Sequence, residues 1–229
     1  MTTIAANLQA VKSRIVAACV AARRDPGQVS LLAVSKTWPA EAVRQAAQCG
    51  QRAFGENYVQ EALAKVAALA DLGLEWHFIG PLQSNKSRSV AEVFAWVHSI
   101  DRLKLAERLS AQRPVGMPPL QVCVQVNVSN ETSKSGCTTD EALALCRAVA
   151  VLPNLRLRGL MAIPEPAQES AVAVRRFSQL CALRDRLNDE GLGLDTLSMG
   201  MSGDLEEAIA AGATIVRVGT AIFGERAKT

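Results

Sequence analysis

The chain has 229 residues, of which 49% are hydrophobic and 21% are charged. This composition excludes an intrinsically disordered or fibrous protein and is sufficient for a sizeable buried core. The 25 basic and 22 acidic residues leave a formal charge of +3, and no run of Lys and Arg provides the basic surface that binding to a nucleic acid would need.

An amphipathic pattern over residues 4–24 predicts a helix at the start of the chain. After it, short apolar and β-branched runs alternate with amphipathic segments. The runs predict strands at 31–35, 52–56, 75–79, 95–100, 121–128, 155–162, 194–199 and 214–219. The segments between them predict helices at 39–49, 58–70, 85–93, 101–111, 139–151, 169–190 and 204–211. Gly50, Gly191 and Gly212 each follow a helix, where a left-handed residue is favoured.

The strict alternation of strands and helices predicts a parallel sheet. The count of eight strands favours a closed barrel over an open, doubly wound sheet, as does the lack of a G-x-G-x-x-G pattern after the first strand. We therefore predict an α/β fold in which residues 1–229 form a single (β/α)8 TIM-type barrel domain with an extra N-terminal helix. Because no helix is predicted after strand eight, the N-terminal helix is expected to cover the gap between strands eight and one.

The sequence indicates neither a secretory leader nor an apolar run of about 18 residues, so we expect neither export nor membrane insertion. The six cysteines are scattered without a C-x-x-C pair, and neither His77 nor His98 has a second His or a Cys at metal-ligand spacing. We therefore expect a cytoplasmic protein with reduced thiols, no metal site and no membrane partner.

Lys36 is the first candidate for chemistry, because reactive groups of such barrels lie where strands end and βα loops begin. It directly follows the apolar run at 31–35. An ammonium group there must be paired or have a lowered pKa, since its desolvation is costly. A lysine with a lowered pKa is a nucleophile towards aldehydes and forms a Schiff base. The alternative is that Lys36 extends into solvent or pairs with Glu56.

Small-residue turns follow the last two predicted strands. The segment 198–204 reads Ser-Met-Gly-Met-Ser-Gly-Asp, in which Ser202 and Asp204 are natural N-cap residues and the glycines allow close approach to the backbone. This turn and the pair Gly219-Thr220 after strand eight are typical of the phosphate site of such barrels. The alternative is an ordinary capped helix followed by a tight turn.

Arg217 lies within strand eight, on the face that it shares with Ile215 and Gly219. A guanidinium group at this position needs an acceptor, which is either a buried carboxylate or a ligand atom such as a ring nitrogen. A Schiff-base lysine, a phosphate site and an arginine available to a heteroaromatic nitrogen together fit pyridoxal 5′-phosphate. The three features together indicate this cofactor far more specifically than any one of them does alone.

Seven segments of the chain resemble the YggS/PROSC family of pyridoxal phosphate homeostasis proteins. They are 33–37 (AVSKT), 54–61 (FGENYVQE), 76–86 (WHFIGPLQSNK), 133–136 (SKSG), 159–161 (GLM), 198–202 (SMGMS) and 217–224 (RVGTAIFG). The resemblance spans nearly the whole chain after residue 30, in the same order. It implies a barrel similar to the N-terminal domain of alanine racemase.

The same resemblance implies the residues at the cofactor. They are Lys36 as the internal aldimine, Arg217 facing the pyridine nitrogen, Ser202, Gly219 and Thr220 at the phosphate, and Asn57, His77 and Met199 near the ring. Lys134, in the loop after strand five, matches a second lysine that the family uses in cofactor transfer. The chain departs from its relatives at Gly203, where an acidic residue is common, and this is expected to loosen the loop while keeping its backbone N–H.

Two classes of function remain open, a cofactor carrier and an enzyme. The favoured function is to hold pyridoxal phosphate on Lys36 for its homeostasis or delivery to apo-enzymes, without robust catalysis. An arginine opposite the ring nitrogen keeps that nitrogen unprotonated, which weakens the ring as an electron sink. The alternative is a small pyridoxal phosphate-dependent amino-acid racemase, with Tyr58 or His77 as the second acid/base.

A cofactor-free aldolase would explain Lys36 and the phosphate turns but not Arg217. The resemblance also bears on assembly, because alanine racemase takes its second base and its main dimer contact from an extra C-terminal domain. The chain stops soon after strand eight. We therefore expect a carrier that is a monomer, with pyridoxal phosphate and PLP-dependent apo-enzymes as partners.

Overall fold

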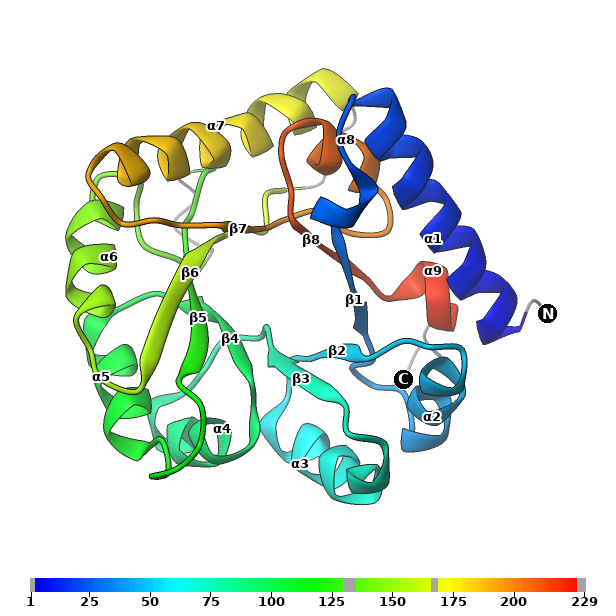
Figure 1. Cartoon of the computed structure of the whole chain (residues 1–229), viewed down its shortest axis with the longest axis horizontal. Coiled ribbons are helices and arrows are strands. Elements are labelled where there is room, and N and C mark those ends of the chain that lie inside the picture. Colours follow the sequence, from blue (N-terminus) through cyan, green and yellow to red (C-terminus); the bar gives the residue numbers. More distant parts are fainter. Residues whose placement is uncertain (1–2, 130–134, 166–168, 226–229) are drawn as a thin grey trace.

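The computed structural model describes residues 3–129, 135–165 and 169–225. Its strands pair in parallel in the order β1-β2-β3-β4-β5-β6-β7-β8, and β1 also pairs with β8, so that the sheet closes into a ring (Figure 1). The prediction of a closed (β/α)8 barrel is confirmed.

The strands lie where the apolar runs predicted them. Their bounds are β1 Ser30–Val34, β2 Ala53–Glu56, β3 Glu75–Phe78, β4 Trp96–Ile100, β5 Leu120–Gln125, β6 Leu155–Met161, β7 Thr196–Ser198 and β8 Ile215–Val218. β5 ends three residues before the predicted end at 128. The reason is that Val126 forms an isolated bridge with Cys137, and the Asn127 N–H donates to the Cys137 carbonyl at 2.9 Å.

The helices surround the ring. Their bounds are α1 Ile4–Ala21, α2 Ala40–Gln48, α3 Val59–Ala68, α4 Ser87–Val93, α5 Leu103–Gln112, α6 Ala142–Ala150, α7 Ser170–Asp189, α8 Leu205–Ala210 and α9 Thr220–Phe223. The short helix α9 was not predicted. It forms because the carbonyl of Gly219 accepts hydrogen bonds from the N–H groups of Ile222 and Phe223, both at 2.9 Å, directly after β8.

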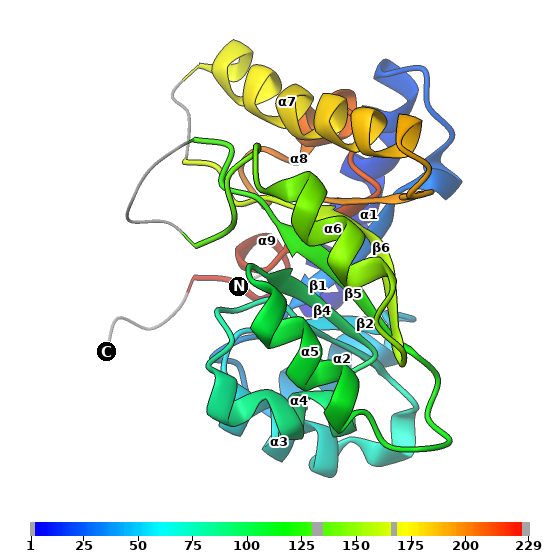
Figure 2. The same cartoon turned by 90° about the vertical axis from the view of Figure 1, so that its left-hand side faces the viewer.

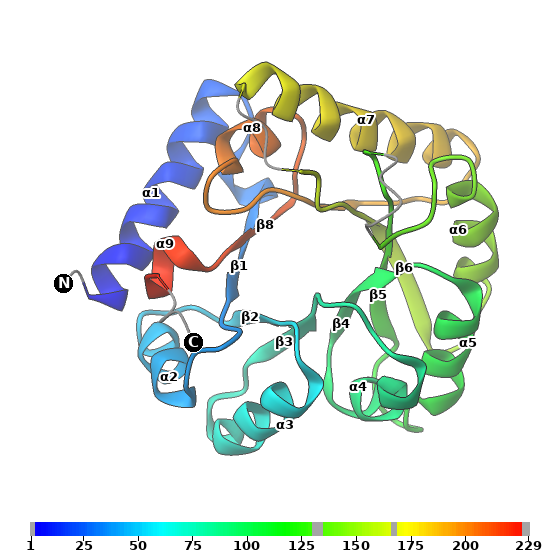
Figure 3. The same ribbon diagram turned by 180° about the vertical axis from the view of Figure 1, so that it is seen from behind.

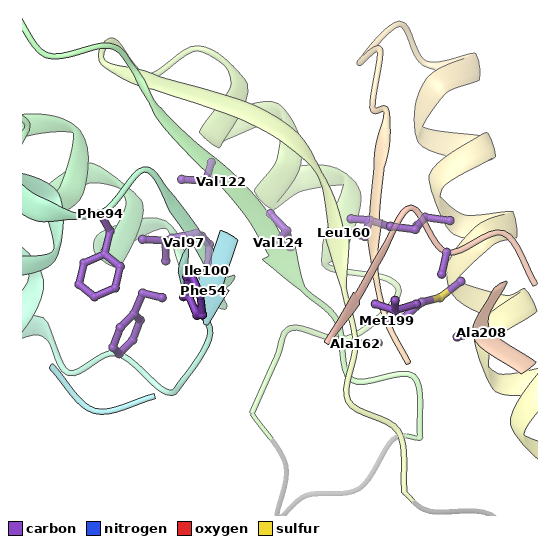
Figure 4. Packing of buried hydrophobic residues seen from close by; sticks show 14 of the residues in the cluster. Phe54, Phe94, Val97, Ile100, Val122, Val124, Leu160, Ala162, Met199 and Ala208 are labelled. Atoms are coloured by element: carbon purple, nitrogen blue, oxygen red, sulfur yellow. The ribbon is translucent and has the colours of Figure 1, made fainter. Parts of the chain in front are cut away.

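Side chains of the strands alternate between two apolar layers. The outer layer packs the strands against the helices and includes Phe54, Phe78 and Leu160; Figure 4 shows part of it. A smaller cluster comprises Leu32, Val34, Ile79, Trp96, Cys123, Met161 and Ile215. Burying one large apolar side chain contributes about 1.5–3 kcal/mol. The outer layer therefore carries the larger share of the hydrophobic stabilisation.

Helix α1 lies against α8, α9 and α2 and covers the junction of β8 and β1, as predicted (Figures 1 and 3). The Asn7 side-chain amide donates to the Ile222 carbonyl of α9 at 2.9 Å. By length and mean hydropathy, 1.2 over 18 residues, α1 is the one described helix that could cross a membrane, so the expectation of no such run was wrong. A barrel-covering helix passes the same test, and α1 buries Leu8 and Val11 in the outer layer.

Candidate functional site

A cavity of about 220 Å³ lies at the carboxyl ends of β1, β2 and β8. Figure 2, in a view at 90° to Figure 1, shows α9 on the same side of the barrel as the described part of the loop after β5. Six of the predicted site residues line this cavity: Lys36, Asn57, Ser202, Arg217, Gly219 and Thr220. Val34, Ile79 and Ile163 add apolar walls. The structure therefore brings together an amine, a guanidinium group, an amide and two small-residue turns beside an apolar surface.

The turn that carries Lys36 is held from behind by a buried ionic network. The Lys65 ammonium, on α3, donates to the Ser35 carbonyl at 2.6 Å and to the carboxylates of Glu56 and Glu61 at 2.7 and 2.6 Å. The Thr37 N–H donates to Glu61 at 2.5 Å, and Thr37 itself has a φ of 68°, a conformation that costs an L residue about 1–2 kcal/mol. Contacts of Lys65 and Glu61 thus fix the backbone on both sides of Lys36.

Glu56 is fully buried at the end of β2 and accepts hydrogen bonds from Lys65 and from the Ser35 hydroxyl. Burial raises the pKa of the Glu56 carboxyl, and the hydrogen bond from Lys65 opposes this effect. Sequence reasoning missed Lys65, because a lysine in an amphipathic helix is normally on the solvated face. The one signal was the i, i+4 spacing of Glu61 and Lys65, which allows an ion pair along a helix.

The loop between β7 and α8 is shaped by a contact within itself and by contacts to α8 and to the turn after β8. Gly200 has a φ of 88°, and a Cβ there would lie 2.5 Å from the Ala208 Cβ, so the loop packs directly on α8. The Met201 N–H donates to the Asp204 carboxylate at 2.5 Å. The Ser202 hydroxyl accepts from the Ala221 N–H at 3.4 Å, which ties this loop to the turn after β8.

Arg14 of α1 supports the same loop from outside. Its guanidinium donates to the Ser202 carbonyl at 3.2 Å and to Glu206 at 2.8 Å. This orients the Ser202 backbone from the N-terminal helix, more than 180 residues away in the sequence. Nothing in the sequence pattern indicated this contact of Arg14, because an arginine on an amphipathic helix is commonly solvated.

The Arg217 guanidinium is buried, and its partners differ from the carboxylate that the sequence left open. It donates to the Ser198 carbonyl at 2.5 Å, the Ser198 hydroxyl at 2.8 Å and the Ala162 carbonyl at 2.8 Å. No ion pair joins Arg217 to a carboxylate within the described residues. Burial lowers the pKa of Arg217 to about 10, so the group remains a cation at neutral pH.

Asn57, which lines the cavity, carries one unsatisfied polar atom. Its Oδ1 is buried and has no hydrogen-bond partner among the described residues. Such an atom costs about 1–3 kcal/mol unless a ligand or water fills the bond. Gly80 fixes the Asn57 backbone, because a Cβ at Gly80 would lie 2.4 Å from the Asn57 carbonyl oxygen. The backbone that presents Asn57 at the cavity is therefore fixed by this close contact.

Two predicted site residues do not line the cavity. His77 points into the barrel, where its ring hydrogen-bonds His98 at 2.9 Å and Glu75 at 2.8 Å. Met199 is fully buried in the outer apolar layer, which also contains Ala208 (Figure 4). Their expected place near the ring came from the family resemblance, but the alternation of side chains along a strand directs neighbours to opposite faces. Lys134 lies outside the described residues.

A larger depression of about 610 Å³ lies at the amino ends of the strands. Its arginines already have partners: Arg158 binds Asp195, Arg184 binds Asp185, and Arg24 donates to the Ile209 carbonyl. Size alone would favour this depression, but the amine and the guanidinium at the smaller cavity make that one the candidate site.

The fold and the site define a (β/α)8 barrel with a ligand site of lysine, arginine and small-residue turns at the carboxyl ends of its strands. The family model described as alanine racemase, N-terminal domain, matches residues 3–227. A relative from Pseudomonas aeruginosa, named pyridoxal phosphate homeostasis protein, is 64% identical over 226 residues, which cover 99% of this chain and 97% of that protein. The chain belongs to the pyridoxal phosphate homeostasis protein family, within the alanine racemase N-terminal-domain fold.

Other relatives agree. The pyridoxal phosphate homeostasis protein of Escherichia coli K12 is 54% identical, with 99% of this chain and 98% of that protein covered. The structure of PipY from Synechococcus elongatus with PLP bound has a TM-score of 0.84 at 40% identity and covers 97% of this chain and 100% of that chain. Alanine racemase from Corynebacterium glutamicum, at 19% identity and a TM-score of 0.70, shares the fold and is covered over 61% of its length.

Proposed function

We propose that this chain binds pyridoxal 5′-phosphate in the cavity at the carboxyl ends of its strands and acts in the homeostasis of that cofactor. The observation that carries the proposal is the meeting of Lys36, Arg217 and the turns at Ser202 and Gly219 around one cavity. The PLP-bound PipY and the names of the relatives support the same ligand.

The residues present fit the group in kind. Pyridoxal phosphate supplies an aldehyde, which condenses with a primary amine with loss of water. Lys36 is the amine at the cavity, and its turn is fixed by Lys65 and Glu61. Ser202 and Thr220 offer hydroxyls, and the turns at Ser202 and Gly219 offer backbone N–H groups, to a phosphate in the cavity that they line. Gly219 packs closely on β1, since a Cβ there would lie 3.1 Å from the Val34 carbonyl. Arg217 offers N–H donors to a ring nitrogen that is an acceptor.

The structure supports holding the cofactor over turning over a substrate. Racemisation needs a second acid/base opposite Lys36, within hydrogen-bond reach of the substrate proton. Of the two candidates, His77 is bound to Glu75 and His98 inside the barrel, and the Tyr58 side chain is 56% exposed and does not line the cavity. We therefore propose a carrier without robust catalysis, which passes the cofactor to PLP-dependent apo-enzymes.

The ligand and the lysine are tested together by reduction. The protein is loaded with pyridoxal phosphate, treated with borohydride to convert the C=N bond into a stable secondary amine, and digested for mass spectrometry. We expect the label on the peptide that contains Lys36, and a visible absorbance band that Lys36→Ala abolishes and Lys104→Ala, on the exposed side of α5, leaves intact. A label on another lysine alone, or no band in the wild type, would overturn the proposal.

The carrier function is tested by solvent deuterium exchange at Cα of added amino acids. We expect the loaded protein to exchange no faster than free pyridoxal phosphate at the same concentration. Steady exchange by the wild type that Tyr58→Phe removes would favour the racemase instead.

A further inference from the structure

A chain of buried hydrogen bonds connects Arg217 at the cavity to the opposite end of the barrel. The Arg217 Nη1 donates to the Ser198 Oγ at 2.8 Å, the Ser198 Oγ lies 2.8 Å from His98 Nδ1, and His98 Nε2 lies 2.9 Å from His77 Nδ1. His77 Nε2 then lies 2.8 Å from the Glu75 carboxylate. The first four residues are at most 4% exposed, whereas the Glu75 side chain is 51% exposed.

The two ends of this chain set its direction. Arginine can only donate hydrogen bonds and a carboxylate can only accept them. The Ser198 hydroxyl therefore accepts from Arg217 and donates to His98 Nδ1, His98 donates from Nε2 to His77, and His77 donates from Nε2 to Glu75. The opposite direction would leave the Ser198 proton without an acceptor and would bring two acceptors together at Glu75.

Both imidazoles are neutral in this arrangement, and every bond is satisfied. Burial lowers the pKa of His77 and lowers that of His98 well below its ordinary value, where the positive charge of Arg217 acts in the same direction. Trp96 stacks on His77 with ring centroids 5.3 Å apart and also contacts His98 at 5.6 Å, so apolar surface shields the chain from solvent.

The same bonds fix the guanidinium of Arg217. Both Nη1 hydrogens are used by Ser198, through its hydroxyl and its carbonyl, and one Nη2 hydrogen is used by Ala162. These three bonds leave the Nε hydrogen and the second Nη2 hydrogen of Arg217 without an acceptor among the described residues. The group is thus clamped on one side, and its remaining donors are available to a ligand in the cavity that it lines.

We propose that Ser198 and His98 are positioning residues that, through this one-way chain ending at Glu75, hold the Arg217 guanidinium in place, so that its remaining N–H donors select a ligand whose ring presents an unprotonated nitrogen. The inference rests on the proposed function. It adds to that function a reason why the site prefers a ring whose nitrogen is unprotonated. His77, expected near the ring, lies in this chain three residues beyond Arg217.

The selection is measured with two ligands, pyridoxal 5′-phosphate and its 1-deaza analogue, in which a C–H group replaces the ring nitrogen. We expect the wild type to bind the former at least about tenfold more tightly, because a hydrogen bond to a charged donor is lost with the analogue. Ser198→Ala and His98→Leu should each weaken binding of pyridoxal phosphate about five- to tenfold and change the affinity for the analogue by less than about twofold.

Ser99→Ala is the matched control. Ser99 is on the same strand as His98, is equally buried, and has a hydroxyl without a partner among the described residues, so its loss should leave both affinities unchanged. Equal weakening of both ligands by the Ser198 and His98 variants would show a merely structural role and overturn the inference, as would unchanged discrimination. If the wild type binds neither ligand at Lys36, the proposed function itself fails. Failure of the inference alone is recognised because the wild type still binds pyridoxal phosphate at Lys36.

Glu75 provides a second pair of variants that does not disturb the buried interior. Glu75→Gln keeps an acceptor for His77, whereas Glu75→Leu removes it and leaves the chain without its end. We expect about threefold loss of discrimination in Glu75→Leu and none in Glu75→Gln. The same discrimination in both would overturn the inference even if the Ser198 and His98 variants failed to fold.

Discussion

At the scale of single residues, the site depends on charged groups that have been taken out of water. Lys65 and Glu56 are 4% and 0% exposed, and their bond fixes the backbone at Ser35, next to Lys36. A buried pair is costly to form but far more costly to break, because removal of one member leaves the other uncompensated. Lys65 is therefore as important for the geometry of the site as the residues that line it.

We expect Lys65→Met to lower the free energy of unfolding by about 3–5 kcal/mol at pH 7.5. Without Lys65, burial raises the pKa of Glu56 further, so the folded state keeps a proton that the unfolded chain releases first as the pH rises. Stability of the variant should therefore fall as the pH rises above the ordinary glutamate pKa, and the defect should shrink at pH 5. Urea unfolding at the two pH values measures it.

Lys104→Met, on an exposed position of α5, is the control and should show no resolvable change. A Lys65 variant as stable as this control at pH 7.5 would contradict the interpretation of a buried pair.

At the scale of elements, the site is made by short loops that two helices hold in place. The loop between β7 and α8 packs on α8 through Gly200, is tied to α9 by Ser202, and is supported by Arg14 of α1. The loop needs its glycine at 200, where φ is 88° and a side chain would meet Ala208. At Gly203, by contrast, a Cβ would have no described atom within 4 Å.

Gly200→Ala should therefore lower the free energy of unfolding by about 2–4 kcal/mol, from left-handed strain and the contact with Ala208. It should also weaken binding of pyridoxal phosphate, because Ser202 lies two residues further along the displaced loop. Thermal unfolding and a binding titration measure the two effects. Gly203→Ala is the matched control and should change stability by less than about 0.5 kcal/mol; equal effects of the two substitutions would contradict the account.

At the scale of the whole molecule, the ring has a polar path through an otherwise apolar interior. The chain from Arg217 to Glu75 runs from one end of the barrel to the other, with both histidines of the protein in it. Because burial lowers the pKa of both rings, the folded barrel binds protons at them less readily than the unfolded chain does.

We expect stability to fall by at most about 2 kcal/mol between pH 6.5 and 5.5 on account of these two groups. Their folded pKa values lie below the unfolded value, so as the pH falls the unfolded chain takes up protons that the folded protein does not, and unfolding becomes easier. Urea unfolding across this range measures the slope. His98→Leu should reduce it by about 1 kcal/mol, since the carboxylates, Glu56 included, contribute equally to both proteins. The same slope in both would contradict the prediction.

Much of the fold was predictable because it follows from local pattern. The eight runs of apolar residues predicted the strands, and α1 covers the junction of β8 and β1 as expected. The missed helix α9 is one turn of four residues, too short to show a hydrophobic period. The site was predictable where a residue follows the end of a strand, as Lys36 does, or forms a small-residue turn, as Ser202 and Gly219 do; Asn57 was expected there only from the family resemblance.

The sequence by itself determined the alternation of strands and helices, the closed count of eight, and the residue types that could bind an aldehyde, a phosphate and a ring nitrogen, because these depend on neighbours in the chain. Only the tertiary structure decided which buried groups meet. His77 joins His98 and Ser198 in the interior, Lys65 pairs with Glu56 behind Lys36, and Arg14 reaches the loop at Ser202. Those contacts join separate strands and helices, and their geometry exists only after the ring has closed.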